Sequence, residues 1–204
     1  MVLFKIFQST YLKVIRFYTI QIIFIILFSC SDKIENKNTI DYGIVINEIN
    51  YNSSNDFDSD DWVEIYNNTN DTISIGSWLL KDDNDEHVFI LPANTMILPQ
   101  QYTVLCKDTS RFLELFPEIE SVHGDLGFGL SGNSDHVRLY DANEVLVDIV
   151  EYDDEPPWPV MADGEGSTLE LIHPDMDNAN WNSWSPSIGF GTPGSVNSVF
   201  ESGI

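Results

Sequence analysis

The chain contains 204 residues, enough for one ordinary globular domain, and its 9 basic and 33 acidic residues give a formal net charge of -24. Lys5, Lys13 and Arg16 lie in the first 29 residues, which contain no acidic residue, so residues 30–204 carry 6 basic and 33 acidic groups, or -27. Such a surface repels phosphate backbones. Direct nucleic-acid binding is therefore not expected, whereas cations or basic partners would be attracted.

The first 29 residues have the pattern of a signal peptide. Three basic residues lie within residues 1–16, and residues 17–29 are almost wholly apolar. Thirteen residues in a helix would span roughly 20 Å, which is less than the roughly 30 Å hydrocarbon core of a bilayer. The pattern therefore predicts an exported protein with a signal peptide at 1–29, rather than a stable membrane span.

The sequence Leu27-Phe28-Ser29-Cys30 resembles the bacterial lipobox, although Phe28 replaces the small residue usual at that position. The resemblance implies that the chain is cut before Cys30 and that this cysteine is acylated. Residues 30–42 would then be a lipidated cysteine and a polar tether, and the protein would lie in the cell envelope, at the periplasmic face of the outer membrane or on the cell surface. The alternatives are an ordinary secretory signal and a signal anchor with a free cysteine.

From residue 43 onward, short apolar runs alternate with turn residues. Runs rich in Val, Ile, Tyr, Trp and Thr predict β-strands near 43–50, 61–67, 72–75, 77–81, 87–91, 95–98, 101–106, 135–140, 144–152 and 167–172. No βαβ alternation is evident. This pattern predicts an all-β sandwich or barrel, in which Cys106, lacking a partner, is a buried thiol.

One helix is expected near 109–116. Asp108, Thr109 or Ser110 could cap its N-terminus, the spacing of Phe112, Leu115 and Phe116 gives an apolar face, and the proline at 117 would end it.

Several stretches in the same chain order resemble the lamin tail domain. They are VINEIN (45–50), DWVEIYN (61–67), ISIGSWLLKDD (73–83), ILPANTMILPQQYTVLC (90–106), GLSGNSDHVRLYDANEVLVDIVEY (129–152), GSTLELIHP, NWNSW and GTPGSVN. The resemblance implies an immunoglobulin-like β-sandwich over 43–197, followed by a C-terminal tail at 198–204. Five tryptophans would supply apolar area for its core: Trp62, Trp78, Trp158, Trp181 and Trp184.

Lamin tail domains act as binding or scaffolding units, so the resemblance implies a non-catalytic module and brings no catalytic residues. A membrane-anchored lipoprotein that binds a protein or glycan at the bacterial cell envelope is the function expected first. A calcium-binding surface protein is a second hypothesis, and a small carboxylate-dependent hydrolase is a third.

Two groups of acidic residues are the candidate sites for these alternatives. Asp56, Asp58, Asp60 and Asp61 form an oxygen-rich loop that could hold Ca²⁺, although the spacing lacks the glycine and the glutamate of an EF-hand. Glu48 and Glu64 each lie inside an apolar strand. They are paired catalytic carboxylates, structural carboxylates that accept backbone N–H groups, or residues on the solvent face of an edge strand. The non-catalytic interpretations are favoured, because both residues belong to stretches that resemble the family. The four histidines are scattered and form no metal-binding motif.

Overall fold

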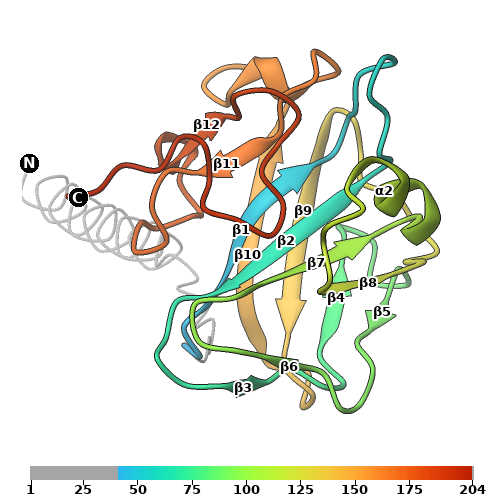
Figure 1. Cartoon of the computed structure of the whole chain (residues 1–204), viewed down its shortest axis with the longest axis vertical. Helices are drawn as coiled ribbons and strands as arrows, with labels where there is room; N and C mark the ends of the chain where they lie inside the picture. The colour runs from blue at the N-terminus through green and yellow to red at the C-terminus, as the bar shows by residue number, and fades with distance from the viewer. Residues whose placement is uncertain (1–40, 204) are drawn as a thin grey trace, which may run out of the picture. The chain divides into compact units, whose positions relative to one another are not determined.

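The computed structural model describes residues 41–203, which form a two-layered β structure with one short helix (Figure 1). The strands are β1 (Ile44–Asn50), β2 (Trp62–Asn67), β3 (Ile73–Ser74), β4 (Leu79–Lys81), β5 (Phe89–Ile90), β6 (Met96–Ile97), β7 (Tyr102–Cys106), β8 (Val122–Gly124), β9 (Ser134–Tyr140), β10 (Leu146–Asp153), β11 (Leu169–Leu171) and β12 (Trp184–Pro186). The helix α2 covers Thr109–Leu115, and two 3₁₀ turns, η1 and η2, cover Val160–Ala162 and Trp181–Ser183.

Two main sheets form the sandwich. The larger has the strand order β12-β11-β1-β2-β7-β8, the smaller has the order β10-β9-β4-β5, and β3 pairs with β6 in a separate two-stranded ribbon. Alternate side chains of both main sheets meet in one core, exemplified by Ile46, Ile65 and Leu105 from the large sheet and Val137 and Leu139 from β9. The expected all-β immunoglobulin-like sandwich is confirmed.

The larger sheet is also covered on its outer face, opposite the sandwich core. Trp62, Val104 and Cys106 project there and form a second apolar cluster with Phe112 of α2. The C-terminal residues run over the same face beside β1 and β2 (Figure 1). Because both faces of β1 and β2 are covered, almost every residue in these strands is buried, including the polar Asn47, Glu48 and Glu64.

The helix forms where the sequence predicts it. The Asp108 carboxylate accepts a hydrogen bond from the backbone N–H of Arg111 at 2.9 Å, which satisfies one free donor of the first turn. Phe112 is fully buried under the helix, and the backbone N–H of Phe116 closes the last turn on the carbonyl of Phe112.

Two strands and one connection differ from expectation. β8 and β12 lie in stretches not predicted as strands, and β8 pairs with β7 in parallel, through α2. A parallel neighbour requires a crossover, which the helix supplies, so the expectation of no βαβ connection is wrong for this pair. β8 spans three residues, including a histidine and a glycine, and such a segment gives almost no strand signal.

The tryptophans divide into three groups. Trp78, Trp158 and Trp184 join the main core as predicted. Trp62 is instead buried on the outer face, beneath α2, so its assignment to the core between the sheets is wrong. Trp181 is 50% exposed, so its assignment to the inter-sheet core is wrong. It opens the 3₁₀ turn η2, whose geometry turns this ring outward while Trp184 enters the core. Cys106 is fully buried, as predicted, and burial raises the pKa of its thiol to about 11.

Within residues 41–203, no helix combines the length and the apolar character needed to cross a membrane. The predicted signal peptide and Cys30 lie outside the described residues.

Candidate functional site

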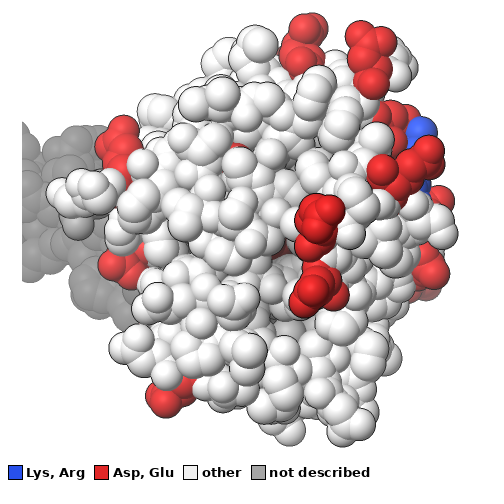
Figure 2. Space-filling view, in the orientation of Figure 1, with Lys and Arg blue, Asp and Glu red and all other residues white. Residues whose placement is uncertain are grey.

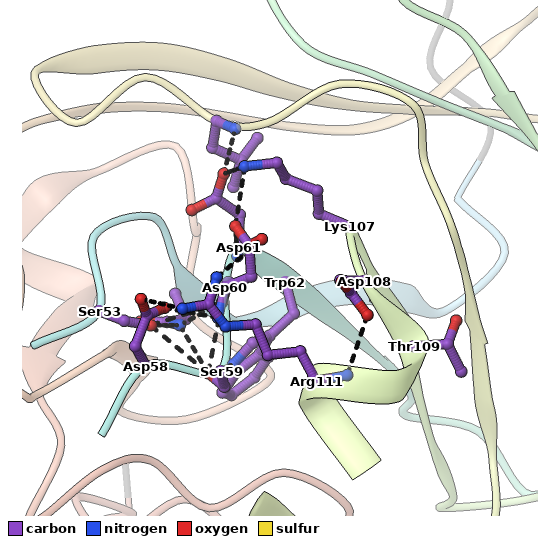
Figure 3. A network of polar contacts seen from close by, with 12 residues as sticks. Ser53, Asp58, Ser59, Asp60, Asp61, Trp62, Lys107, Asp108, Thr109 and Arg111 are labelled. Carbon is purple, nitrogen blue, oxygen red and sulfur yellow. Dashed lines mark hydrogen bonds and ion pairs between the residues drawn. The ribbon is translucent and has the colours of Figure 1, made fainter. Parts of the chain in front are cut away.

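The acidic loop before β2 is held by two basic side chains from the β7–α2 region (Figure 3). The Lys107 ammonium lies 2.8 Å from Asp60 Oδ1 and 3.6 Å from Asp61 Oδ2. The Arg111 guanidinium pairs with the Asp58 carboxylate, and its Nη1 lies 3.5 Å from Asp60 Oδ2. Three of the four carboxylates proposed as calcium ligands therefore already have cationic partners.

The pairing sets the protonation of Asp60 and Asp61. Burial alone would raise the pKa of Asp60, but the hydrogen bond from Lys107 and the N–H of Asp61 lower it below its usual value. Asp61 is more deeply buried, and burial raises its pKa to about 6, although the backbone N–H of Leu130 and the Lys107 ammonium oppose the shift. A calcium ion would have to displace Lys107 from these oxygens. The ion pairs therefore oppose calcium binding at this loop, which stays a hypothesis from the sequence.

Asp56 is exposed at the tip of the same loop. The base of the loop is fixed by neutral groups: the amide of Asn50 donates to the carbonyl of Asp60 at 2.8 Å, and the Trp62 indole N–H donates to Ser59 Oγ at 3.0 Å. These hydrogen bonds fix the acidic loop to β1 and β2.

A row of three glutamates crosses the outer face of the large sheet. Glu48 on β1 is in register with Glu64 on β2 and with Glu170 on β11, and all three side chains are fully buried. Sequence reasoning singled out the first two and missed Glu170. The same signal was present, because Glu170 is also a charged residue inside a short apolar strand.

The C-terminal segment supplies hydrogen-bond donors to all three carboxylates. Thr192 donates its backbone N–H to Glu48 Oε1 at 3.0 Å and its hydroxyl to Glu170 Oε1 at 2.7 Å. The backbone N–H of Gly194 donates to a Glu64 carboxylate oxygen, and Ser198 donates its hydroxyl to Glu170 Oε2 at 2.7 Å.

Donors from β1 and from the residue before β11 complete this arrangement. The Thr168 hydroxyl lies 2.6 Å from Glu48 Oε1, and the Asn47 amide lies 3.0 Å from Glu64 Oε1. Asn197 then ties the segment down, because its amide donates to the carbonyls of Asn47 at 3.0 Å and Leu171 at 2.8 Å. The glutamates therefore anchor the C-terminal segment, as the structural interpretation of Glu48 and Glu64 predicted.

Burial and mutual repulsion govern the charge of this row. Burial, followed by the charges of Glu64 and Glu170, raises the pKa of Glu48 well above its usual value, against the opposing hydrogen bonds from Thr168 and Thr192. Burial also raises the pKa of Glu64 to about 8, although the N–H of Gly194 and the Asn47 amide lower it. Raised carboxyl pKa values can serve acid–base catalysis, but here the surrounding donors fix the carboxylates to the protein itself.

A second acidic group forms where two loops meet. One carboxylate oxygen from each of Asp82, Asp83 and Asp135 lies within 4.8 Å of the others. Asp135 accepts backbone N–H groups from Asp83 and Ser131, and Asp82 Oδ2 lies 2.6 Å from His87 Nδ1. Through these hydrogen bonds, the three aspartates hold the two loops together.

A groove opens on the outer face between the start of β7, the α2–β8 connection and the C-terminal segment. Its volume is 410 Å³, and it is lined by residues 96–98, 101–104, 118–121 and 194. A smaller hollow of 130 Å³ shares Tyr102 and is lined also by Asn47, Tyr66, Leu171, Pro174, Val196, Asn197 and Phe200. The rings of Tyr66 and Tyr102 stack with their centroids 4.6 Å apart.

The sequence profile of the Lamin Tail Domain matches residues 41–154 of this chain, which is more than half of its length. The chain belongs to the lamin tail domain family. No curated protein gives a significant match. The match includes Glu48 and Glu64 but ends before Glu170 and the segment that covers all three.

The extent of the lamin tail domain beyond residue 154 stays a prediction. We expected the family resemblance to continue to residue 197, and β11 and β12 do join the same large sheet, with β11 paired directly to β1. The family is one of non-catalytic immunoglobulin-like domains, and membership indicates a binding or scaffolding module.

Proposed function

We propose that this chain is a lipid-anchored binding module of the bacterial cell envelope, held in the outer membrane through acylated Cys30. The lipobox-like sequence before Cys30 and the polar stretch that follows it support the anchor. The lamin tail domain would then be carried on a short tether at the periplasmic face or on the cell surface, available to a second molecule.

One observation carries the non-catalytic part of the proposal. Glu48 and Glu64 are the strongest candidates for an acid–base pair in the sequence, and both are fully buried beneath a segment that donates hydrogen bonds to them. A catalytic carboxylate must contact its substrate, or a water beside the substrate, and these two contact their own C-terminal segment. The groove beside Tyr102 remains open to a partner on this face.

A protein or glycan partner is proposed over nucleic acid because of charge. The described residues include four basic side chains, Lys81, Lys107, Arg111 and Arg138, and each already contacts a tyrosine ring or an aspartate. Among these residues, no cluster of free cations is left for phosphate backbones, which require such contacts.

The anchor is tested by replacing Cys30. The full chain, its Cys30→Ser variant and a Cys106→Ala control are expressed in a bacterium that carries out lipoprotein maturation, with labelled palmitate in the medium. We expect label and membrane association in the wild type and in Cys106→Ala, and the loss of both in Cys30→Ser. Equal labelling of all three proteins, or of none, would contradict the anchor.

The binding role is tested by cross-linking in intact cells. The wild-type chain should yield a defined cross-linked complex, because a binding module must contact a partner at its site of residence. A chain that reaches the envelope and yields only its own monomer would refute the binding role while leaving the anchor intact.

A further inference from the structure

The edge of β7 is left open at Tyr102. The carbonyl of Gln101 accepts the N–H of Asn67, and the N–H of Lys107 donates to the carbonyl of Asp61, both on the β2 side. The N–H of Val104 instead donates to the carbonyl of Ser121 on the β8 side. Backbone groups alternate along a strand, so the N–H and C=O of Tyr102 also point toward the β8 side. β8 begins only at Val122, and among residues 41–203 no backbone hydrogen bond joins Tyr102 to the segment before it.

This open backbone borders a groove with an apolar floor and an acidic rim. Ile97 is buried in the floor, and Leu98 is 57% exposed beside it. Glu118 and Glu120 line the opposite wall and are both exposed. Figure 2 shows acidic atoms on an otherwise uncharged part of this face, where Figure 1 places the connection between α2 and β8.

The aromatic pair adds a third feature. Tyr66 and Tyr102 are half-buried and stacked, and Tyr102 borders both the groove and the smaller hollow. The face of a tyrosine ring attracts Lys and Arg side chains electrostatically. The rim glutamates attract the same groups, so the charge and the aromatic surface select for one class of side chain.

We propose that the groove beside Tyr102 binds an extended peptide segment that carries Lys or Arg side chains and pairs its backbone with Tyr102. This inference rests on the proposed binding function and specifies its partner. The peptide backbone would continue the sheet where β8 has not begun, as in other cases of strand addition. Alternate apolar side chains would enter the floor at Ile97, and the basic side chains would lie over Tyr102 and between Glu118 and Glu120.

The shape of the site favours a peptide over a glycan. A sugar ring can stack on an aromatic side chain and donate its hydroxyls to carboxylates, but it neither completes a strand edge nor supplies the cation that an acidic rim attracts. A peptide satisfies the Tyr102 backbone, the floor and the rim together.

The test uses the full chain in non-ionic detergent micelles and a fluorescein-labelled Lys-Val-Lys-Val-Lys-Val peptide. Fluorescence anisotropy measures its affinity for the wild type, for Glu118→Gln/Glu120→Gln and for the control Glu86→Gln/Glu151→Gln. The control removes the same charge from exposed positions outside the groove lining. We expect the rim variant to weaken binding about 5- to 20-fold and the control less than about 2-fold, since close charge pairs contribute more than distant charges.

Three further measurements locate the peptide. Methylation of the central Val nitrogen should weaken binding about 5-fold or more, because it removes a backbone donor from the strand pairing. A benzophenone-bearing version should cross-link to residues 96–104 or 118–121. A Glu-Val-Glu-Val-Glu-Val peptide should not bind.

Several results would overturn the proposal: equal affinity for the rim and control variants, cross-links elsewhere, or no binding of the Lys-Val peptide. Binding of chitotetraose that depends on Tyr102, without binding of the Lys-Val peptide, would assign the groove to a glycan instead. Each of these outcomes can occur while cross-linking in cells still captures a partner. Failure of the groove proposal is therefore distinguishable from failure of the binding function.

Discussion

The pH dependence of stability should reveal the buried glutamate row, and Glu64→Gln is the perturbation that isolates it. Glu64 lies between the N–H of Gly194 and the amide of Asn47, is fully buried, and has a pKa raised from 4.5 to about 8. A carboxyl whose pKa is higher in the folded state holds more protons there than in the unfolded chain. Its contribution to stability is therefore complete below pH 4.5 and is lost as the pH rises toward 8.

The expected magnitude follows from the size of the shift. Each pKa unit corresponds to roughly 1.4 kcal/mol, so a rise from 4.5 to about 8 gives on the order of 5 kcal/mol between the two limits. The Gln variant has no titrating group at this position. At pH 5 the Gln variant should be less stable than the wild type by about 1–3 kcal/mol. Both carboxyl oxygens of Glu64 accept hydrogen bonds, and the N–H₂ of Gln replaces one of these acceptors. Near pH 9 that deficit should shrink by several kcal/mol or reverse.

Urea unfolding followed by tryptophan fluorescence measures this at pH 5, 7 and 9, for the full chain in detergent. Glu118→Gln is the matched control, because Glu118 is exposed and its replacement should leave the pH profile unchanged. If the free energies of unfolding of wild type and Glu64→Gln run parallel across this range, the reasoning is wrong. Glu64 would then be ionised in the folded protein, with its hydrogen bonds outweighing the cost of burial.

Three other predictions concern the segment over the glutamates and the acidic loop. Gly191 has φ +93°, and a Cβ at this position would lie 2.5 Å from Glu48 Oε1. Gly191→Ala should therefore destabilise the chain by about 2–4 kcal/mol in urea unfolding. An unchanged urea midpoint would show that the C-terminal segment is not fixed over the glutamates. Lys107→Met should lower the free energy of unfolding by about 1–2 kcal/mol, because Asp60 and Asp61 lose their cation. The loss should be larger at pH 8 than at pH 5, since the pKa of Asp61 is about 6. An equal loss at both pH values would contradict this account. Millimolar Ca²⁺ should leave the melting temperature of the wild type unchanged from its value in EDTA, since Lys107 and Arg111 already pair with three of the four carboxylates. A rise of several degrees would instead establish the predicted calcium site.

Much of the fold was predictable because short segments of the sequence carry the patterns that specify its strands and its helix. Alternating apolar residues place DHVRLY in β9, and the capping aspartate with the spacing of Phe112, Leu115 and Phe116 places α2 within a residue of its expected end. The failures occur where local signal is weak. β8 is a strand only because β7 lies beside it, and Trp181 is exposed only because of the turn in which it lies.

The candidate sites depended more on the tertiary structure. The acidic loop is correctly found as a concentration of carboxylates, but Lys107 and Arg111, which pair with three of them, come from about 50 residues further along the chain. The Tyr66–Tyr102 pair has no sequence signature at all, because two tyrosines 36 positions apart become neighbours only through the register of β2 and β7.

The sequence by itself determined the class of fold, the family, the position of the helix and the strongly acidic surface, because periodicity, capping and charge are properties of short segments. It also showed that Glu48 and Glu64 are unusual, as charged residues within apolar strands. Only the tertiary structure decided what they do, by bringing Glu170 into the same row and laying residues 191–199 across it. The physical reason is that a buried carboxylate requires donors, and the donors here come from a segment more than 100 residues away, whose position no local pattern specifies.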